Sequence, residues 1–511
     1  MSELYFKHKN FIDCLICTFI IGMVAYGYVF FNFTPAHDGI MTVTNDQNWQ
    51  TAIGRGLMQV YVSFRGPVDA PWLIGMLTLL YTGIAVFLTL RLLDIDVSTM
   101  NIFILVAVYV LNITYVCSAT VYIYLLDIYA MSLLLAVAAV YCLYKIRNKI
   151  IAIVVAGVLL SFSMGLYQSY FAVAISLFLI MIARKAIGET ETIVSMLKFG
   201  CMELSSVFIG AGIYAITLKL IQYITNVEPY DSYNSVSNLS ALSLSRIIEL
   251  IPMSLKTFWD LFFNNPLYGN RIYVIINIIL LAISVLAYID CFINMRLVAN
   301  RIFLVVTLVI FPLGANCIYI LSNGMVHYLM VFSYQMFYVL MLLPFIVNKA
   351  DSTRKIWGVL ERRLITGLIA VLSIIVIRFS NDISYYQKLV GEGTAASINN
   401  ILYDIERYPD FNKETMPIIV IGEPGEALAQ EYDLQDFFGC YPGVGAWGTT
   451  ITYKSVFQSY FHFILGRNYN FDYTEEAEQK IRACNEYGEM PVYPSIGYIR
   501  VIDGYLVIKF E

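Results

Sequence analysis

Two short polar stretches stand out in a chain that is otherwise strongly apolar, and both carry groups able to do chemistry. The first contains His37 and Asp38, and the second begins at Asp46 and reaches Arg55. A carboxylate can act as a general base that removes a proton from a hydroxyl group. A guanidinium can hold a phosphate through its planar fork of donors. These residue types therefore allow a proton transfer beside a bound phosphate.

Each acid also has a purely structural interpretation. Asp38 can shape a turn before Gly39, and Asp46 can cap the helix that follows it. A base that acts on a lipid-linked substrate must lie outside the bilayer and close to it, as this loop is expected to do. We therefore favour Asp38 as the base and keep Asp46 as the second choice, with His37 orienting or tuning Asp38.

Other charged groups are expected on the same face of the membrane. Arg55 and Arg65 can bind the phosphate of a lipid carrier or contact phospholipid headgroups. Asp127 falls in an apolar segment, where an unpaired charge is costly, so we expect an ion pair with Lys219 or with a loop arginine. Three further polar side chains are assigned supporting roles near this face: Tyr167, Gln168 and His327.

The composition indicates which elements must position these groups. Of 511 residues, 59% are hydrophobic and 14% are charged, whereas a soluble domain carries roughly 25% charged residues. Apolar runs of about 17 to 25 residues can cross a bilayer as helices. We predict a mainly α polytopic membrane protein with eleven spans. They lie near residues 11–31, 72–92, 101–118, 120–144, 150–166, 168–184, 198–224, 272–294, 301–321, 326–348 and 362–380.

The distribution of basic residues predicts how these spans are oriented. With the N-terminus inside, the inner connections hold sixteen of the Lys and Arg residues before position 381, and only seven lie elsewhere. Because Lys and Arg resist translocation, the region after residue 380 is expected outside. Residues 1–380 form the predicted membrane domain, with outer loops at 32–71 and 225–271. Amphipathic helices are expected within these loops at 46–64 and 245–263.

The residue pattern of 381–511 is typical of a small water-soluble α/β domain. An apolar strand is expected at 416–421, a polar helix at 474–487, and a hairpin at 499–510 around Asp503 and Gly504. This region holds nineteen acidic against nine basic residues, which argues against nucleic acid as a partner. Cys440 and Cys484 could form a disulfide in an oxidising compartment.

The sequence gives little support for a metal-binding or nucleotide-binding site. The chain has only four histidines, and none has the spacing of a zinc site. The run from Gly422 to Gly425 lacks the spacing of a dinucleotide loop, and a turn that ends a strand is the favoured interpretation. We expect no required cofactor, although a divalent metal stays open.

Several short motifs, in this order, resemble a known family. They are His37-Asp38, Gly54-Arg55, Asp127-Ile128-Tyr129, Tyr167-Gln168-Ser169-Tyr170, Met490-Pro491-Val492-Tyr493-Pro494, Gly497-Tyr498-Ile499 and Val507-Ile508-Lys509. Together with the membrane layout they resemble the bacterial O-antigen glucosyltransferases of serotype conversion, a glucosyl transferase II-like family. That family is similar to the type C membrane glycosyltransferases.

The resemblance implies a multi-span inner-membrane enzyme whose C-terminal domain is periplasmic. It implies undecaprenyl phosphate glucose as donor, a donor synthase and a flippase as functional partners, and a lipid-linked O-antigen repeat as acceptor. Asp38 matches the family's loop acid, although this chain lacks an adjacent acidic pair. Arg55, Arg65 or Lys219 would bind the donor phosphate. The expected acceptor-binding aromatics are Trp447, Tyr493 and Tyr498. The alternatives are a lipid-linked glycan flippase or other transporter, and an O-antigen polymerase.

Overall fold

The computed structural model divides the chain into two compact units. Unit 1 comprises Met1–Phe31, Asp46–Ala119 and Leu125–Asn381, and unit 2 comprises Asn32–Asn45, Thr120–Tyr124 and Asp382–Glu511. The structure describes residues 2–32, 34, 36–41, 48–66, 69–95, 98–189, 191–230, 243–264, 268, 270–347, 355–409, 411–429 and 449–511.

Unit 1 is built from helices. The longer ones are α1 (Ser2–Phe31), α5 (Pro71–Leu92), α6 (Thr99–Val110), α7 (Ile113–Val121), α8 (Leu126–Lys145), α9 (Lys149–Leu166), α10 (Phe171–Gly188), α11 (Ile193–Thr225), α12 (Leu244–Phe263), α13 (Arg271–Asn294), α14 (Val298–Ala315), α16 (Met336–Val347) and α17 (Lys355–Glu406). Shorter elements are α3 (Asn48–Ala52), α4 (Leu57–Arg65), α15 (Cys317–Leu321) and the 3-10 turns at Ile123–Leu125, Gln168–Tyr170, Tyr328–Met330 and Phe332–Gln335. Of these elements, the last two residues of α7, the part of α17 beyond Asn381 and the turn residues Ile123 and Tyr124 belong to unit 2.

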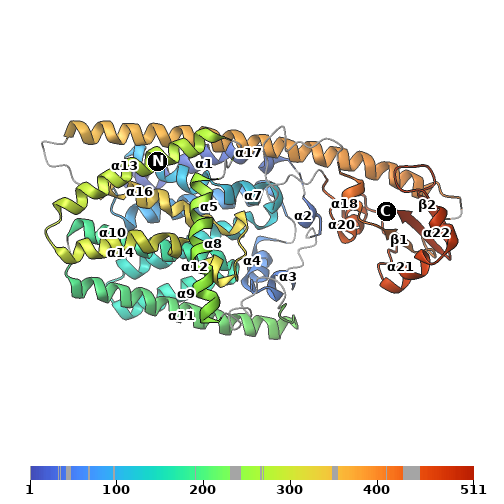
Figure 1. Ribbon diagram of the computed structural model, residues 1–511, viewed down its shortest axis with the longest axis horizontal. Coiled ribbons are helices and arrows are strands. Elements are labelled where there is room, and N and C mark those ends of the chain that lie inside the picture. The colour runs from blue at the N-terminus through green and yellow to red at the C-terminus, as the bar shows by residue number, and fades with distance from the viewer. Residues whose placement is uncertain are drawn as a thin grey trace. The chain divides into compact units, whose positions relative to one another are not determined.

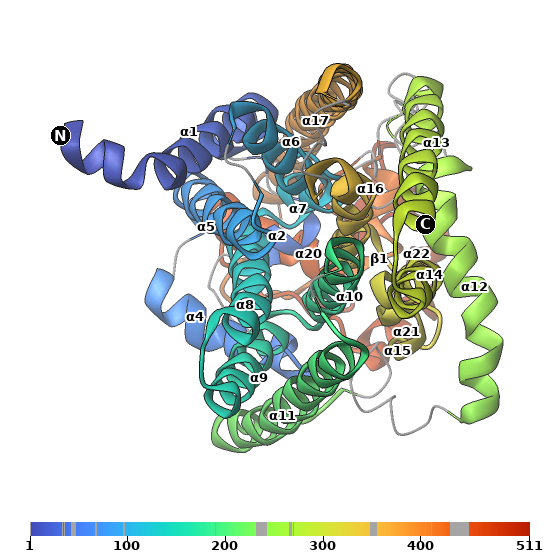
Figure 2. The same cartoon turned by 90° about the vertical axis from the view of Figure 1, so that its left-hand side faces the viewer.

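Neighbouring helices of unit 1 pack along their lengths. Helix α8 packs against α5 and α9, and α11 packs on α9 (Figure 2). Helix α10 contacts both α8 and α14 (Figure 1). Large apolar side chains such as Leu204, Phe208 and Ile216 remain exposed on α11. An exposed apolar face of this extent is typical of a surface that meets lipid.

The prediction of a mainly helical membrane protein is confirmed. In the described part of the chain, nine helices are long and apolar enough to cross a membrane, or ten if the bent pair α6 and α7 forms one span. A shorter apolar helix covers Phe332–Phe345, inside the predicted span at 326–348. Each of the eleven predicted ranges therefore overlaps an apolar helix.

Three helix predictions differ from the structure in detail. The single helix expected at 46–64 is two helices, α3 and α4, because Gly54 has a φ of 95° and turns the chain between them. The polar helix expected at 474–487 is divided into α21 (Glu475–Arg482) and α22 (Asn485–Glu489). Helix α17 continues past 380 to Glu406, since no proline interrupts it. The helix expected at 245–263 is present as α12.

Unit 2 combines a small sheet with short helices. The strands β1 (Ile418–Ile421), β2 (Ile499–Ile502) and β3 (Tyr505–Lys509) lie in the order β1-β3-β2, with β1 parallel and β2 antiparallel to β3. The helical elements are α2 (His37–Met41), α18 (Pro424–Ala427), α20 (Lys454–Ser459), the π-helical turn Tyr460–Ile464, α21 and α22 (Figure 1).

Both faces of this sheet are covered, which explains the uninterrupted apolar run of β1. Ile418 and Val420 belong to one core cluster, while Ile419 and Ile421 belong to the other, as the two-residue period of a strand requires. The predicted hairpin is confirmed, because Asp503 and Gly504 have φ angles of 49° and 82° between β2 and β3, as a type I′ turn demands.

The loop that carries the favoured acid folds with the C-terminal residues. Ile40 of α2 is fully buried in the same core cluster as Ile398, Ile401 and Ile405 of α17. Those three isoleucines recur at helical spacing, so they present one apolar face. The core of unit 2 is thus assembled from segments that lie far apart in the sequence.

Candidate functional site

Asp38 lies in the first turn of α2, beside a histidine. The Nε2 atom of His37 is 3.3 Å from Oδ1 of Asp38, and the His37 side chain is buried while that of Asp38 is 38% exposed. Ile40, on the same short helix, anchors it in the core of unit 2. The structure therefore holds a half-buried carboxylate against a fixed imidazole.

Burial changes the protonation of both groups. It raises the pKa of Asp38 above 3.8, while the nearby His37 acts to lower it. Burial lowers the pKa of His37 below 6.5, against the opposing effect of Asp38. Near pH 7 the imidazole is therefore mainly neutral. A carboxylate with a raised pKa is a stronger base than an ordinary aspartate.

Two tyrosines that the sequence analysis did not single out surround this imidazole. The ring centroids of Tyr122 and Tyr453 lie 6.1 Å and 6.3 Å from that of His37. Tyr122 comes from the short segment Thr120–Tyr124, and Tyr453 immediately precedes α20. No local pattern in the sequence pairs either tyrosine with His37, because such contacts depend on the tertiary fold.

Arg55 lies in unit 1, in the turn at residues 53–56 that joins α3 to α4. Its Nη1 donates a hydrogen bond of 2.8 Å to Gln50, and its guanidinium carbon lies 4.4 Å from the ring centroid of Tyr167. Two side chains hold the turn through its carbonyls. Gln168 donates to the oxygen of Ile53 at 3.1 Å, and Tyr214 donates to that of Gly54 at 2.9 Å.

His327 lies near this arginine. The positive charge of Arg55 acts on the imidazole of His327. The structure thus brings together four predicted residues, Arg55, Tyr167, Gln168 and His327, from three separate segments. An arginine with an imidazole nearby offers hydrogen-bond donors suited to a phosphate.

Arg65 has a different environment. Its Nη1 lies 2.9 Å from Oδ1 of Asp127, and its Nη2 pairs with Asp69. The side chains of Arg65 and Asp127 are 1% and 0% exposed, and Asp127 also accepts a hydrogen bond of 2.9 Å from Tyr61. Of the partners expected for Asp127, the loop arginine is the one observed. Lys219 lies exposed on α11.

The aromatic residues expected to bind an acceptor have other surroundings. Tyr498 is only 5% exposed, and its hydroxyl donates to Asp404 at 2.9 Å. The partly buried Tyr493 packs edge-to-face against Tyr498, with 5.0 Å between ring centroids. Both rings contribute to the core of unit 2.

Three of the predicted site residues lie outside the described part of the chain, and the described part offers few groups that could bind a metal. Asp46, Cys440 and Trp447 lie outside the described residues. The thiol of Cys484 contacts the carbonyl oxygen of Lys480 at 3.4 Å. Within the described ranges, no group of three or more His, Cys, Asp or Glu side chains could hold a metal ion.

A comparison with protein families bears on this arrangement. The family described as glucosyl transferase GtrII matches residues 27–348, which is more than half of the chain and includes the Asp38 and Arg55 motifs. No curated protein and no solved structure matches the chain. The match favours a glucosyl transferase over the transporter or polymerase that the sequence left open. This membrane protein therefore belongs to the GtrII family of glucosyl transferases.

Proposed function

We propose that this protein transfers glucose from undecaprenyl phosphate glucose to a sugar hydroxyl of a lipid-linked O-antigen repeat. The reaction would take place on the periplasmic face of a bacterial inner membrane, with a synthase and a flippase supplying the donor. The observation that carries this proposal is the half-buried carboxylate of Asp38, held beside a buried imidazole in a chain of the GtrII family.

In the proposed reaction Asp38 accepts the proton of the acceptor hydroxyl. That oxygen attacks the anomeric carbon of glucose, and the bond between this carbon and the phosphate oxygen breaks. Undecaprenyl phosphate leaves with the bonding electrons, and the configuration of the anomeric carbon inverts. Because the leaving group is already an anion, its departure needs electrostatic stabilisation more than a proton.

Arg55 is the preferred phosphate ligand of the three basic residues considered. It stacks on Tyr167 near His327, in a turn pinned by Gln168. The charge of Arg65 is compensated by two carboxylates. A phosphate would have to compete with them, so we assign Arg65 a structural role in the proposal.

The variant Asp38→Asn tests the proposed base. Loss of a general base should reduce glucosyl transfer by roughly 100-fold or more, while protein abundance in the membrane stays unchanged. The assay combines mass and linkage analysis of lipopolysaccharide with transfer by isolated membranes supplied with the donor. Glu426→Gln, which removes an exposed carboxylate of the same unit, is the matched control.

The pH dependence provides a second readout of the same experiment. Because burial raises the pKa of Asp38 above 3.8, activity should be lost, as pH falls, at a higher pH than an ordinary aspartate would give. His37→Gln should shift this loss of activity to a still higher pH, since His37 lowers the pKa of Asp38. Normal glucosylation by Asp38→Asn membranes would refute the assignment.

A further inference from the structure

We infer that Tyr453 and Tyr122 form an acceptor-binding platform, which stacks on a sugar ring of the O-antigen repeat beside Asp38. The inference rests on the proposed function and assigns its acceptor site to residues that the sequence analysis did not select. All of the groups involved belong to unit 2.

The platform surrounds the imidazole that contacts the proposed base. Tyr122 and Tyr453 both meet the His37 ring edge-on, each at an interplanar angle of 74°. The ring centroid of Tyr122 also lies 6.5 Å from that of Tyr124. Two distant segments therefore place aromatic rings around the histidine that touches Asp38.

The exposed fractions of the three tyrosine side chains show which rings can contact a ligand and which ring only packs beneath them. Tyr453 is 58% exposed and Tyr122 is half-buried, whereas Tyr124 is buried. A Cβ added to Gly39 would lie 3.8 Å from the Tyr124 ring, so this tyrosine packs under α2. An exposed tyrosine offers an apolar ring face and a polar hydroxyl. The apolar C–H face of a hexose and its hydroxyl groups complement these two features.

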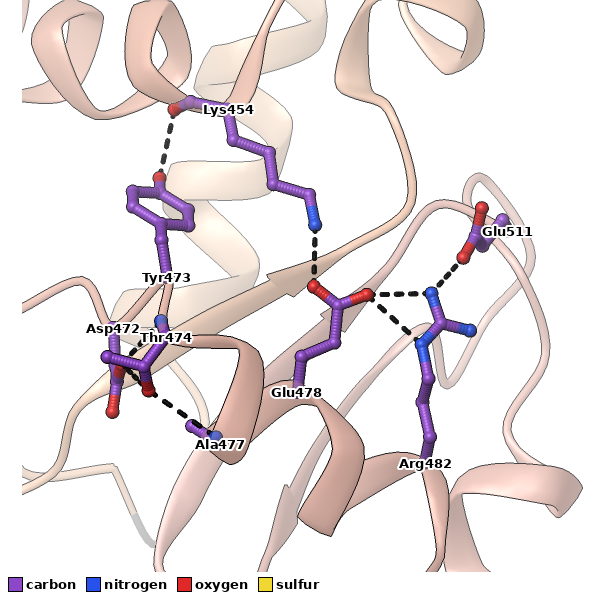
Figure 3. A network of polar contacts seen from close by, with 8 residues as sticks. All are labelled: Lys454, Asp472, Tyr473, Thr474, Ala477, Glu478, Arg482 and Glu511. Carbon is purple, nitrogen blue, oxygen red and sulfur yellow. Dashed lines mark hydrogen bonds and ion pairs between the residues drawn. The ribbon is translucent and has the colours of Figure 1, made fainter.

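A network of polar contacts fixes the backbone that carries Tyr453. Its neighbour Lys454 donates through Nζ to Glu478 at 2.9 Å, and the carbonyl oxygen of Lys454 accepts from Tyr473 at 3.0 Å (Figure 3). Glu478 also accepts two hydrogen bonds from Arg482, of 2.8 Å and 3.0 Å, and Arg482 contacts Glu511.

The same segment is joined directly to the helix of the proposed base. Helix α20 packs against α2, and the hydroxyl of Ser455 lies 3.9 Å from the sulfur of Met41. Tyr453 immediately precedes α20, and Asp38 lies on α2. The platform and the base are therefore held by packed elements, as a positioned binding site requires.

Binding of the acceptor glycan tests the platform independently of catalysis. The probe is the repeat oligosaccharide released from the host's lipopolysaccharide, titrated calorimetrically into the purified full-length protein. Tyr453→Ala should weaken binding about five- to tenfold, and Tyr122→Ala should act in the same direction. Tyr453→Phe should bind nearly normally, because it retains the ring. Tyr385→Ala removes another exposed tyrosine of unit 2 and should have no effect.

The kinetics distinguish failure of the platform from failure of the proposed function. Tyr453→Ala should raise the KM for the acceptor while the KM for undecaprenyl phosphate glucose stays unchanged. Asp38→Asn should abolish transfer and still bind the oligosaccharide. If Tyr453→Ala binds and uses the acceptor normally while Asp38→Asn is inactive, the platform is wrong and the proposed base stands. If the unaltered protein does not bind the oligosaccharide, the platform is also overturned.

Discussion

Individual residues with the same formal charge have different roles in this fold. Arg55 stacks on a tyrosine in the turn between α3 and α4, whereas Arg65 is buried between two carboxylates. The sequence places both arginines in one polar loop and offers no reason to separate them. Arg65 has the surroundings of a structural ion pair, and its loss would leave Asp127 buried without that compensation.

Arg65→Gln should therefore destabilise the protein more than Asp69→Asn, which changes the more exposed of the two partners of Arg65. We expect a loss of about 3–5 kcal/mol, the usual cost of breaking a buried ion pair. Asp69→Asn should cost much less, because one arginine serves two carboxylates and the amide oxygen can still accept its hydrogen bond. Thermal unfolding in detergent measures both variants. An equal loss for the two would contradict this view of the network.

The same network predicts a pH dependence of stability. Burial raises the pKa of Asp69 from 3.8 to about 6, so the folded state binds this proton more tightly than the unfolded state. The contribution of Asp69 to stability is therefore greatest below pH 3.8, and it is lost as pH rises from there to about 6. Asp69→Asn should remove this component from the pH dependence of the melting temperature.

At the scale of elements, the turn between α3 and α4 positions Arg55. Gly54 supplies the positive φ, and side chains from two other helical segments hold the turn at its carbonyl oxygens. Gln168 therefore acts in the proposal as a positioning residue. It contacts the turn, and the turn carries the arginine.

Gln168→Leu should raise the KM for undecaprenyl phosphate glucose with little change in the KM for the acceptor. One lost hydrogen bond is worth about 1 kcal/mol, so we expect an increase of roughly five- to tenfold. Gln222→Leu is the matched control, because Gln222 donates to Thr51 in α3, outside the turn. Equal effects of the two variants on the donor KM would indicate general loosening and argue against a positioning role.

At the scale of the whole molecule, basic and acidic residues are concentrated in different parts of the chain. Lys145 and Arg184 both pair with Asp94, so the connections after α5, α8 and α10 gather basic residues at one end of unit 1. These are the connections that the basic-residue rule places inside. The C-terminal region is acidic by contrast, with nineteen Asp and Glu against nine Lys and Arg.

We therefore expect the C-terminus to face the periplasm. Alkaline phosphatase fused after Glu511 should be active, and green fluorescent protein fused at the same position should be dark. A fusion after Arg147, in a predicted inner connection, should give the opposite pair of results. Fluorescence from the C-terminal fusion would overturn the orientation and with it the periplasmic reaction.

The sequence alone determined the features that depend on local patterns. Apolar runs predicted the helices, and Asp503 with Gly504 predicted the hairpin, because span length and turn conformation depend on neighbouring residues. The positive φ of Gly54 could be suspected from its type, but the break it causes in the helix predicted at 46–64 could not be derived. Helical spacing continues through that stretch.

Only the tertiary structure decided which distant groups meet. It grouped the His37 and Asp38 segment with the C-terminal residues, paired Asp127 with Arg65, and brought Tyr453 beside His37 across more than 400 residues of chain. Such contacts result from how buried faces pack, and a linear pattern shows that a face is apolar without showing what covers it.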